Sequence, residues 1–322
     1  MCYSAQIWAE YRKFEREFGS VLSVHQYVSF FWEQKKQGTW RKIAKAMKAA
    51  FANPRTDEER EIAAIIAEGD AEYERALEAE LFQQRKRLIN AERALQSKPT
   101  KKAANDQRVA TAKIAAAKRN LDDLRRKELL PRDSRIYPGQ YAPVMIAKDG
   151  RRLLVPMRYQ CRLPGWTEVV ERKFPGTYNA RRDSLEQAWS KLFGRHHGVM
   201  VVTAFYENVS RHKVEHRELA PGENEENVVL EFNPNPPQDM LVACLWSYSK
   251  GATPDDPGLF SFAAITDEPP PEIAAAGHDR CIIPIKREHL DAWLTPDPDN
   301  LAALYSILND RDRPYYEHRL AA

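Results

Sequence analysis

The sequence predicts an α+β protein with a mostly antiparallel β-sheet or open barrel, flanking helices, and an inserted helical region. Two observations lead to this class. Short apolar runs bounded by proline and glycine fill the chain from about residue 136 onward, as in sheets with few long helices between strands. Before them, apolar residues recur at heptad spacing over two long segments, which indicates an antiparallel coiled-coil hairpin.

Composition sets the broad class. The chain has 322 residues, of which 43% are hydrophobic, enough for a substantial core or two domains. No apolar run approaches the ~20 residues of a membrane span, so we expect a cytoplasmic protein, nucleoid-associated if bacterial. The four cysteines are far apart without a CxxC pair, which argues against a zinc cluster or a disulfide scaffold, and no cofactor motif occurs.

Taking the chain in order, residues 5–52 are predicted to be helical, ending at Asn53-Pro54 because proline disfavours a helical conformation in the residue before it. The hairpin follows, with helices at about residues 57–96 and 101–130. A turn around Pro99 separates them. The apolar seam positions are Leu77, Leu81, Leu88, Ala91 and Leu95, then Ala110, Ile114, Ala117, Leu121 and Leu124.

The hairpin is strongly basic. Residues 85–132 hold fifteen Lys or Arg against five Asp or Glu, whereas residues 215–231 are acidic. Such a block suits a polyanion such as nucleic acid, although a solvated helical face has the same composition. Dimerisation through the seam, or docking on a replication or repair protein, explains the heptads equally well, so the oligomeric state stays open.

The remaining chain alternates predicted strands with short helices. The helices are expected at residues 184–193, 286–294 and about 301–308. The strands are expected at residues 143–146, 152–159, 198–206, 227–232, 241–246, 260–266 and 281–285.

Cys2 is a candidate nucleophile. Its small side chain favours removal of Met1, which would leave an α-amine and a thiol on one residue, with ordinary pKa values near ~8 and ~8.5. An aldehyde could react with both, first as a Schiff base and then as a thiazolidine ring.

Three polar groups interrupt the strand-rich part. Asn179 and Arg181 follow a Pro-Gly turn, Glu207 ends an apolar strand, and His278 and Arg280 precede another. Each also suits an ordinary loop or surface turn. Burial would raise the pKa of Glu207 towards neutrality, as a proton shuttle requires. The neighbouring pair His196-His197 is a poor metal site, and we expect no metal.

The order of these blocks resembles the SOS response-associated peptidase (SRAP) family: Cys2, the Leu-Val-Pro-Met-Arg-Tyr run ending at Tyr159, Asn179-Ala-Arg, Phe-Tyr-Glu207 and His278-Asp-Arg. The resemblance covers residues 1–4 and about 137–294. It implies an SRAP-like fold with an N-terminal catalytic strand at residues 1–4, a helical insertion at 5–135, and a catalytic core with a C-terminal tail at 136–322.

The resemblance also implies chemistry. Cys2 would capture the aldehyde of an abasic site in single-stranded DNA, with possible AP-lyase and Met1-removing activities. Asn179 would hold the amine and sugar, Glu207 would move protons, and His278 would assist opening of the sugar. Arg181 and Arg280 would grip phosphates. Arg158, Tyr159 and Trp166 complete the expected DNA-binding set, the two aromatic rings by stacking on bases.

The chain departs from the family pattern at three places. Tyr3 and Ser4 replace the usual glycine and arginine, Asn208 replaces a tryptophan, and Tyr159-Gln160 replaces tryptophan-glycine.

Two other functions fit the residues. One is an N-terminal-nucleophile cysteine amidohydrolase or peptidase, in which Cys2 attacks an amide. The other is a non-enzymatic coiled-coil scaffold that binds protein or nucleic acid.

Overall fold

The computed structural model describes residues 3–251 and 258–321, so Cys2 lies outside the described residues. The chain forms two compact units. The first contains the sheet and comprises Met1–Phe30, Arg41–Asn53 and Pro131–Ala322. The second comprises Phe31–Trp40 and Pro54–Leu130. Residues 5–30 and 41–53, expected in the insertion, therefore belong to the unit that contains the sheet.

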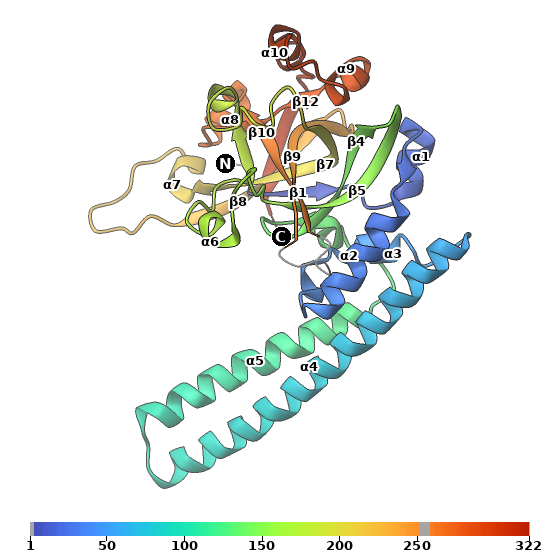
Figure 1. Ribbon diagram of the computed structural model, residues 1–322. Coiled ribbons are helices and arrows are strands. Elements are labelled where there is room, and N and C mark those ends of the chain that lie inside the picture. The colour runs from blue at the N-terminus through green and yellow to red at the C-terminus, as the bar shows by residue number, and fades with distance from the viewer. Residues whose placement is uncertain (1–2, 252–257, 322) are drawn as a thin grey trace. The chain divides into compact units, whose positions relative to one another are not determined.

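Five strands of the first unit close into a barrel, which confirms the α+β prediction (Figure 1). The ring runs β9–β10–β5–β4–β7 and returns to β9, with a single parallel pair between β10 and β5. Closure satisfies the backbone groups that an open edge would expose. The strands are β4 (Tyr141–Lys148), β5 (Arg151–Tyr159), β7 (His197–Ser210), β9 (Met240–Ser249) and β10 (Leu259–Asp267).

The long strand β7 extends beyond this ring. Its first half pairs with β4 and β9, and its second half pairs with β1 on one side and β8 on the other. β13 continues the sheet from β8, and β3 continues it from β1. The further strands are β1 (Ser4–Ile7), β2 (Val21–Leu22), β3 (Arg135–Ile136), β6 (Asn179–Arg181), β8 (Asn227–Asn235), β11 (Cys281–Ile282), β12 (Pro284–Ile285) and β13 (Tyr315–Leu320).

Apolar side chains of the barrel strands are buried at consecutive positions, because the strands are covered on both faces. In β7, Val199, Met200, Val201 and Val202 are all buried. This pattern is typical of strands that are enclosed on both sides rather than half-exposed.

The prediction of continuous helix over residues 5–52 was wrong. Ala5 and Ile7 belong to β1, and the two-residue strand β2 pairs in parallel with β5 between two helices. Apolar periodicity alone did not separate these short strands from helix. The helices in this part are α1 (Tyr11–Phe18), α2 (Val24–Lys36), a 3₁₀ turn (Trp40–Lys42) and α3 (Lys45–Ala49).

The expected helix at residues 184–193 was also wrong, because only a 3₁₀ turn at Arg182–Ser184 and a series of turns occupy it. None of the described helices combines the length and apolar character that a membrane-spanning helix requires. The remaining helical elements are α6 (Glu168–Glu171), α7 (Arg211–Val214), α8 (Pro271–Ala275), α9 (Leu290–Leu294), α10 (Leu301–Asn309) and 3₁₀ turns at Pro131–Ser134 and Arg287–His289.

The second unit contains an antiparallel hairpin of α4 (Asp57–Ser97) and α5 (Lys101–Arg125), within a few residues of the expected bounds (Figure 1). Each helix begins at a threonine cap: the Thr56 hydroxyl accepts from the Glu59 N–H, and Thr100 from Ala103. The buried positions on α4 include Leu77, Gln84 and Ala91, and those on α5 are Ala103, Ala110, Ala117 and Leu121. Small alanines at these positions allow the two backbones to approach closely.

Gly69 provides a second close contact in this unit. A Cβ atom at Gly69 would lie 2.5 Å from Cη2 of Trp40, so the buried indole packs directly on the α4 backbone. The indole N–H also donates to Asp70 Oδ1 at 2.7 Å. Glycine inside a helix normally lowers stability, and here it makes room for the ring.

We therefore expect Gly69→Ala to destabilise the second unit by about 1–3 kcal/mol, despite the higher helix propensity of alanine, because the methyl group overlaps the indole. Urea unfolding followed by circular dichroism at 222 nm measures the change. Trp40→Leu removes the overlapping atoms, so Gly69→Ala should be neutral or stabilising in that background. Equal destabilisation in both backgrounds would contradict the packing argument.

Candidate active site

The described chain starts at the edge of β7. The Tyr3 N–H donates to the Tyr206 carbonyl at 3.1 Å, and Ser4 lies opposite Tyr206 in the antiparallel ladder. Arg135 of β3 fixes this strand from the other side. Its Nε donates to Ser4 Oγ at 3.0 Å, and its guanidinium lies 3.6 Å from the Tyr206 ring centroid. In the family that the sequence resembles, the residue at position 4 is usually arginine. Here position 4 is the buried Ser4, and the arginine that contacts it comes from β3.

Glu207 follows Tyr206 on β7 and is 0% exposed. Burial raises the pKa of its carboxyl to about 8, because the anion loses hydration that the protein replaces only in part. The carboxyl is thus largely protonated at neutral pH. It can give up a proton to a reaction and take it back.

His278 lies against Glu207. Its Nε2 is 3.2 Å from Glu207 Oε2, and its Nδ1 lies 2.9 Å from the carbonyl oxygen of Arg280. We assign the proton to Nδ1, which donates to that carbonyl, so the unprotonated Nε2 faces the Glu207 carboxyl. Burial lowers the pKa of His278, which keeps the ring neutral. The preceding Gly277 has φ +93°, a conformation that glycine adopts without strain.

Asn179 is on β6, which runs parallel to β10 with Asn179 opposite Ala264. Its side chain is buried, and its Oδ1 accepts from the Tyr159 hydroxyl at 3.4 Å. Its Nδ2 has no hydrogen-bond partner among residues 3–251 and 258–321. An orphaned buried amide donor is costly, which favours a ligand or solvent acceptor here.

A pocket of about 500 Å³ adjoins Asn179. Trp166 and Phe174 form its aromatic wall, with ring centroids 5.1 Å apart, and Phe174 is 53% exposed. Arg181 also lines it, with an exposed guanidinium paired to Asp183 at 2.5 Å. The pocket thus combines an aromatic face, an amide donor and a cation. Sequence reasoning missed Phe174, because nothing in the pattern separates an exposed aromatic residue from a core one.

Arg280 occupies a different position from Arg181. Its side chain is only 15% exposed, and its Nε is 3.9 Å from Asp279 Oδ2. The structure therefore places Glu207 of β7 against the turn that carries His278 and Arg280. Asn179 and Arg181 lie together on β6.

Two of the expected DNA-binding residues need correction. Tyr159 is 0% exposed and stacks on Phe262 at 5.2 Å, so its ring cannot face a base; its hydroxyl instead orients Asn179. Arg158 forms an ion pair with the buried Glu171 and donates to the Gln160 carbonyl. It is therefore held within the fold and is not a free phosphate ligand. No sequence pattern pointed to Glu171 as the partner of Arg158.

The departures from the family pattern have structural counterparts. Gln160, where glycine is usual, has φ +137°, a conformation that costs a side-chain-bearing residue strain. Its N–H donates to the Phe262 carbonyl at 3.0 Å, and this hydrogen bond helps to hold the strained conformation. Asn208, where tryptophan is usual, is exposed on β7.

The three described cysteines are buried and unsuited to nucleophilic chemistry. Burial raises the thiol pKa of Cys161 to about 12 and those of Cys244 and Cys281 further. A thiolate is the reactive form, so these residues stay inert at neutral pH.

No metal ligand set stands out in the described residues. His197 uses both ring nitrogens: Nε2 accepts from Gly194 N–H, and Nδ1 donates to the Trp293 carbonyl. Glu288, His289 and Asp310 lie close enough to share an ion, but Lys286 already places its ammonium 2.5 Å from Asp310.

The profile of the SOS response associated peptidase (SRAP) family matches residues 97–319. The chain belongs to this family. Membership makes it a DNA-damage response protein, and the matched region includes Asn179, Glu207 and His278 but not Cys2. No curated protein matches the sequence.

Three of the solved structures that match part of the chain come from two bacteria. A protein from Bordetella bronchiseptica is 15% identical, with 59% of this chain and 87% of that one covered and a TM-score of 0.45. A phage-related protein from the same organism is 18% identical over 58% and 81%, with a TM-score of 0.42. A protein from Bacteroides thetaiotaomicron is 12% identical over 59% and 78%, with a TM-score of 0.43.

The pKa of Glu207 has a measurable consequence for stability. Because folding raises it from 4.5 to about 8, the folded state keeps a proton that the unfolded chain releases between these values. The contribution of Glu207 to stability is therefore lost as pH rises through this window, at up to about 1.4 kcal/mol per pH unit.

We expect Glu207→Gln, which cannot ionise, to become more stable relative to wild type as pH rises from 5 to 8. Urea midpoints at several pH values measure the difference. The exposed Glu218→Gln is the matched control and should follow wild type throughout. A constant offset between Glu207→Gln and wild type would contradict the assignment.

Proposed function

We propose that the protein crosslinks covalently to abasic sites in single-stranded DNA, with Cys2 as the nucleophile. The observation that carries the proposal is the contact of 3.2 Å between Glu207 and His278. It puts a protonated carboxyl next to the β7 edge where residue 3 is hydrogen-bonded. Cys2 precedes Tyr3, with Cα atoms about 3.8 Å apart across one peptide bond.

The chemistry needs an amine, a thiolate and a proton relay. Once the residues ahead of Cys2 are removed, its amine attacks the aldehyde carbon, and the carbinolamine loses its oxygen as water. The sulfur then adds to the same carbon and closes the thiazolidine. The two hydrogens of the released water come from the amine and the thiol, and Glu207 relays them.

The remaining residues of the set have supporting roles. His278, neutral and 3.2 Å from the Glu207 carboxyl, is suited to assist opening of the deoxyribose ring and to return protons to Glu207. The orphaned Nδ2 of Asn179 offers a donor to the sugar or the captured carbon. Arg181 and Arg280 supply cations for flanking phosphates, and Trp166 with Phe174 supplies a surface for a base.

The same Schiff base leads to further activities. A base that removes a proton next to the imine carbon would cleave the strand on the 3′ side by β-elimination, which is AP-lyase chemistry. A peptidase activity would serve to expose the amine of Cys2.

The crosslink itself is the first test. We expect wild type to give a shifted band on a denaturing gel with an oligonucleotide that carries one abasic site, because the thiazolidine survives denaturation. Cys2→Ala should give none. Cys161→Ala is the control, since that thiol is buried and protonated. Loss of the N-terminal methionine, seen by intact mass, should accompany activity. A band undiminished in Cys2→Ala would exclude this mechanism.

The proton relay makes a second, kinetic prediction. Glu207→Gln should lower the crosslinking rate by about 100-fold or more, the usual size of general acid–base catalysis. In wild type, the donor is lost as pH rises through about 8, so the rate should fall above that value. The Gln variant should lack this fall.

Timed quenching of the reaction across pH 6–10 measures both effects. Glu231→Gln is a control, because Glu231 is also buried, opposite Tyr206 on β8, where it pairs with Arg319. A crosslinking rate of Glu207→Gln close to that of wild type would exclude Glu207 from the mechanism. The proposed role of Cys2 as nucleophile would not be affected.

A further inference from the structure

The hairpin separates its charges along its length. Residues 57–80 of α4 contain ten acidic and two basic side chains. Residues 85–108, which span the turn between α4 and α5, contain eight basic and two acidic ones. The half near the turn, which we call the hairpin tip (residues 82–108), therefore holds most of the unbalanced positive charge.

Two of the four cations of α5 outside the tip pair with acids of α4. Arg125 bonds Glu74 at 2.6 Å and Glu78 at 2.7 Å, and Lys113 bonds Glu80 at 3.1 Å. Within the described residues, Arg87 is the cation of the tip that pairs across the hairpin, with Asp106, so most of the basic side chains at the tip do not hold the two helices together.

The tip presents a mixed stripe on the side of α4 away from α5. Phe82, Lys86, Ile89 and Arg93 follow each other at intervals of four, three and four residues, which places them on one helix face. This face is opposite the seam, where Gln84 and Ala91 are buried. Phe82 is 74% exposed and Ile89 is 47% exposed.

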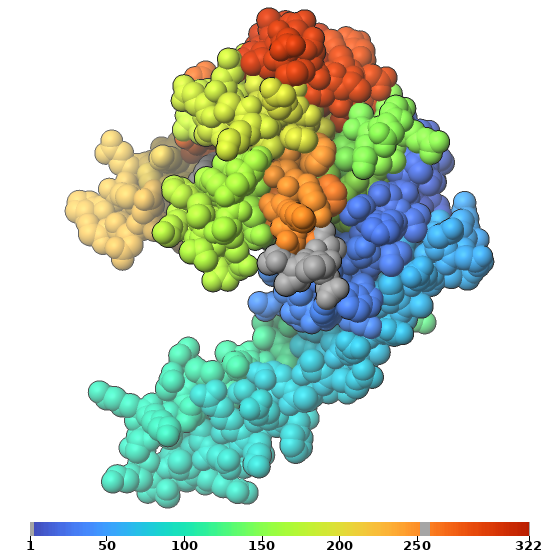
Figure 2. Space-filling model, viewed as in Figure 1, coloured from blue at the N-terminus to red at the C-terminus, as the bar shows by residue number. Residues whose placement is uncertain are grey.

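The cations of this stripe, and Arg85 beside it, are available for a ligand. Arg85, Lys86 and Arg93 are exposed, and none of them forms an ion pair within the described chain. By comparison, Arg87 is held across the hairpin by Asp106 at 2.5 Å. In the space-filling view, long side chains project from the hairpin surface near its turn (Figure 2).

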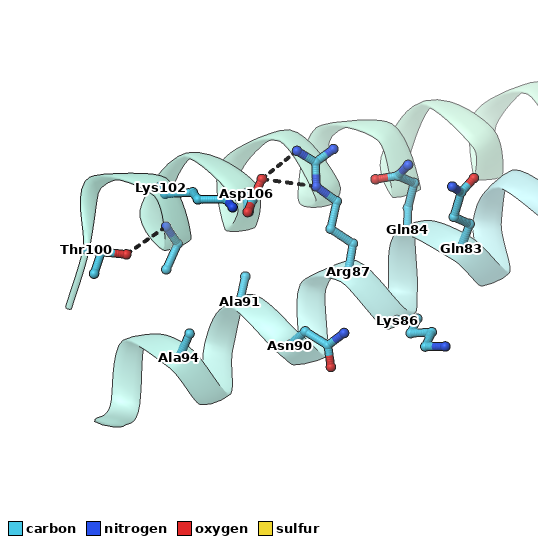
Figure 3. Close-up of a pocket in the computed structure, with 11 residues that line it drawn as sticks. Gln83, Gln84, Lys86, Arg87, Asn90, Ala91, Ala94, Thr100, Lys102 and Asp106 are labelled. Atoms are coloured by element: carbon cyan, nitrogen blue, oxygen red, sulfur yellow. Dashed lines mark hydrogen bonds and ion pairs between the residues drawn. The ribbon is translucent and has the colours of Figure 1, made fainter. Parts of the chain in front are cut away.

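A pocket of about 710 Å³ lies between the two helices at the tip, and Lys86 is the residue of the stripe that lines it (Figure 3). Lys86 and Asn90 line it from α4 and Lys102 from α5, while small alanines at the seam leave its floor open. Gln84 points from α4 towards α5 and is buried; within the described residues its Oε1 has no hydrogen-bond partner. The pocket thus offers cations and amide donors together with one unsatisfied acceptor.

We propose that the hairpin tip is a second nucleic-acid site, which binds single strands through backbone phosphates at Arg85, Lys86 and Arg93 and through stacking of a base on Phe82. The pocket beside Lys86 would receive a polar base edge or sugar. Positive charge interleaved with an exposed aromatic ring is the arrangement that single strands require, because every base has a π-face. The site goes beyond the proposed crosslink and uses none of its residues.

A protein partner fits this surface less well. A helix-docking face has adjoining apolar residues, whereas here each of Phe82 and Ile89 is flanked by a lysine or arginine. Desolvating those cations against an apolar partner would be costly.

The test uses the full chain with Cys2→Ala and an undamaged fluorescent (dT)20 strand, so that no crosslink contributes. Fluorescence anisotropy measures affinity at 50–200 mM salt. The tip variant combines Arg85→Gln, Lys86→Gln and Arg93→Gln. The matched control combines Lys118→Gln, Arg119→Gln and Lys127→Gln, three exposed cations outside the tip with the same change in charge.

We expect the tip variant to bind about tenfold or more weakly and its salt slope to fall by about 2, at ~0.7 for each lost contact with single-stranded phosphates. The control variant should change affinity less than about twofold. Phe82→Ala should weaken binding at least about fivefold, and Phe82→Leu should weaken it similarly, since leucine keeps apolar area but cannot stack.

Equal affinities for the tip and control variants would overturn the proposal. The proposal would also fail if Phe82→Ala changed the molar mass measured by light scattering but left the DNA affinity unchanged. That result would identify the surface as a protein interface. Circular dichroism at 222 nm checks that each variant keeps its helices. The crosslinking assay is separate, so failure of either site leaves the other interpretable.

Discussion

The strand β7 is the element on which the rest of the structure depends, because it pairs with four strands along its length. Its first half closes the barrel, and its second half fixes the N-terminal strand and carries Glu207. Side chains alternate between faces, so a slip of one residue in the pairing of Ser4 with Tyr206 would turn the side chains of β1 to the opposite face of the sheet. Arg135 stabilises this register through Ser4 and the Tyr206 ring.

The two units use charge in opposite physical regimes. Around Glu207, charge is removed from water, so burial decides protonation and added salt has little effect. On the hairpin, the charges are mostly exposed, and the ion pairs between α4 and α5 leave Arg85, Lys86 and Arg93 of the tip unmatched within the described chain. A polyelectrolyte partner would bind to the exposed cations of the hairpin through counterion release, so its affinity would depend on salt. Covalent chemistry depends instead on the buried charge around Glu207.

The sequence predicted features that depend on local pattern and missed those that depend on distant partners. The heptads and the Pro99 turn were enough to locate α4 and α5 to within a few residues. Family order pointed to Glu207 and His278 separately, but only the fold shows their contact across about seventy residues of chain. Tyr159 was misjudged because alternation along a strand does not tell which face is enclosed. The Arg158–Glu171 pair and the exposure of Phe174 likewise depend on tertiary packing.

The pairing of β1 with late strands also fixes an order of events during synthesis. Ser4 cannot meet its partner Tyr206 until about two hundred further residues exist, which takes about 10–40 s at ~5–20 residues per second. The hairpin, by contrast, closes with partners such as Arg87 and Asp106 that are 19 residues apart. The hairpin can therefore fold while the chain is still being synthesised and the N-terminal segment is still unpaired. Processing enzymes have this interval in which to act on the N-terminus before β1 pairs with β7.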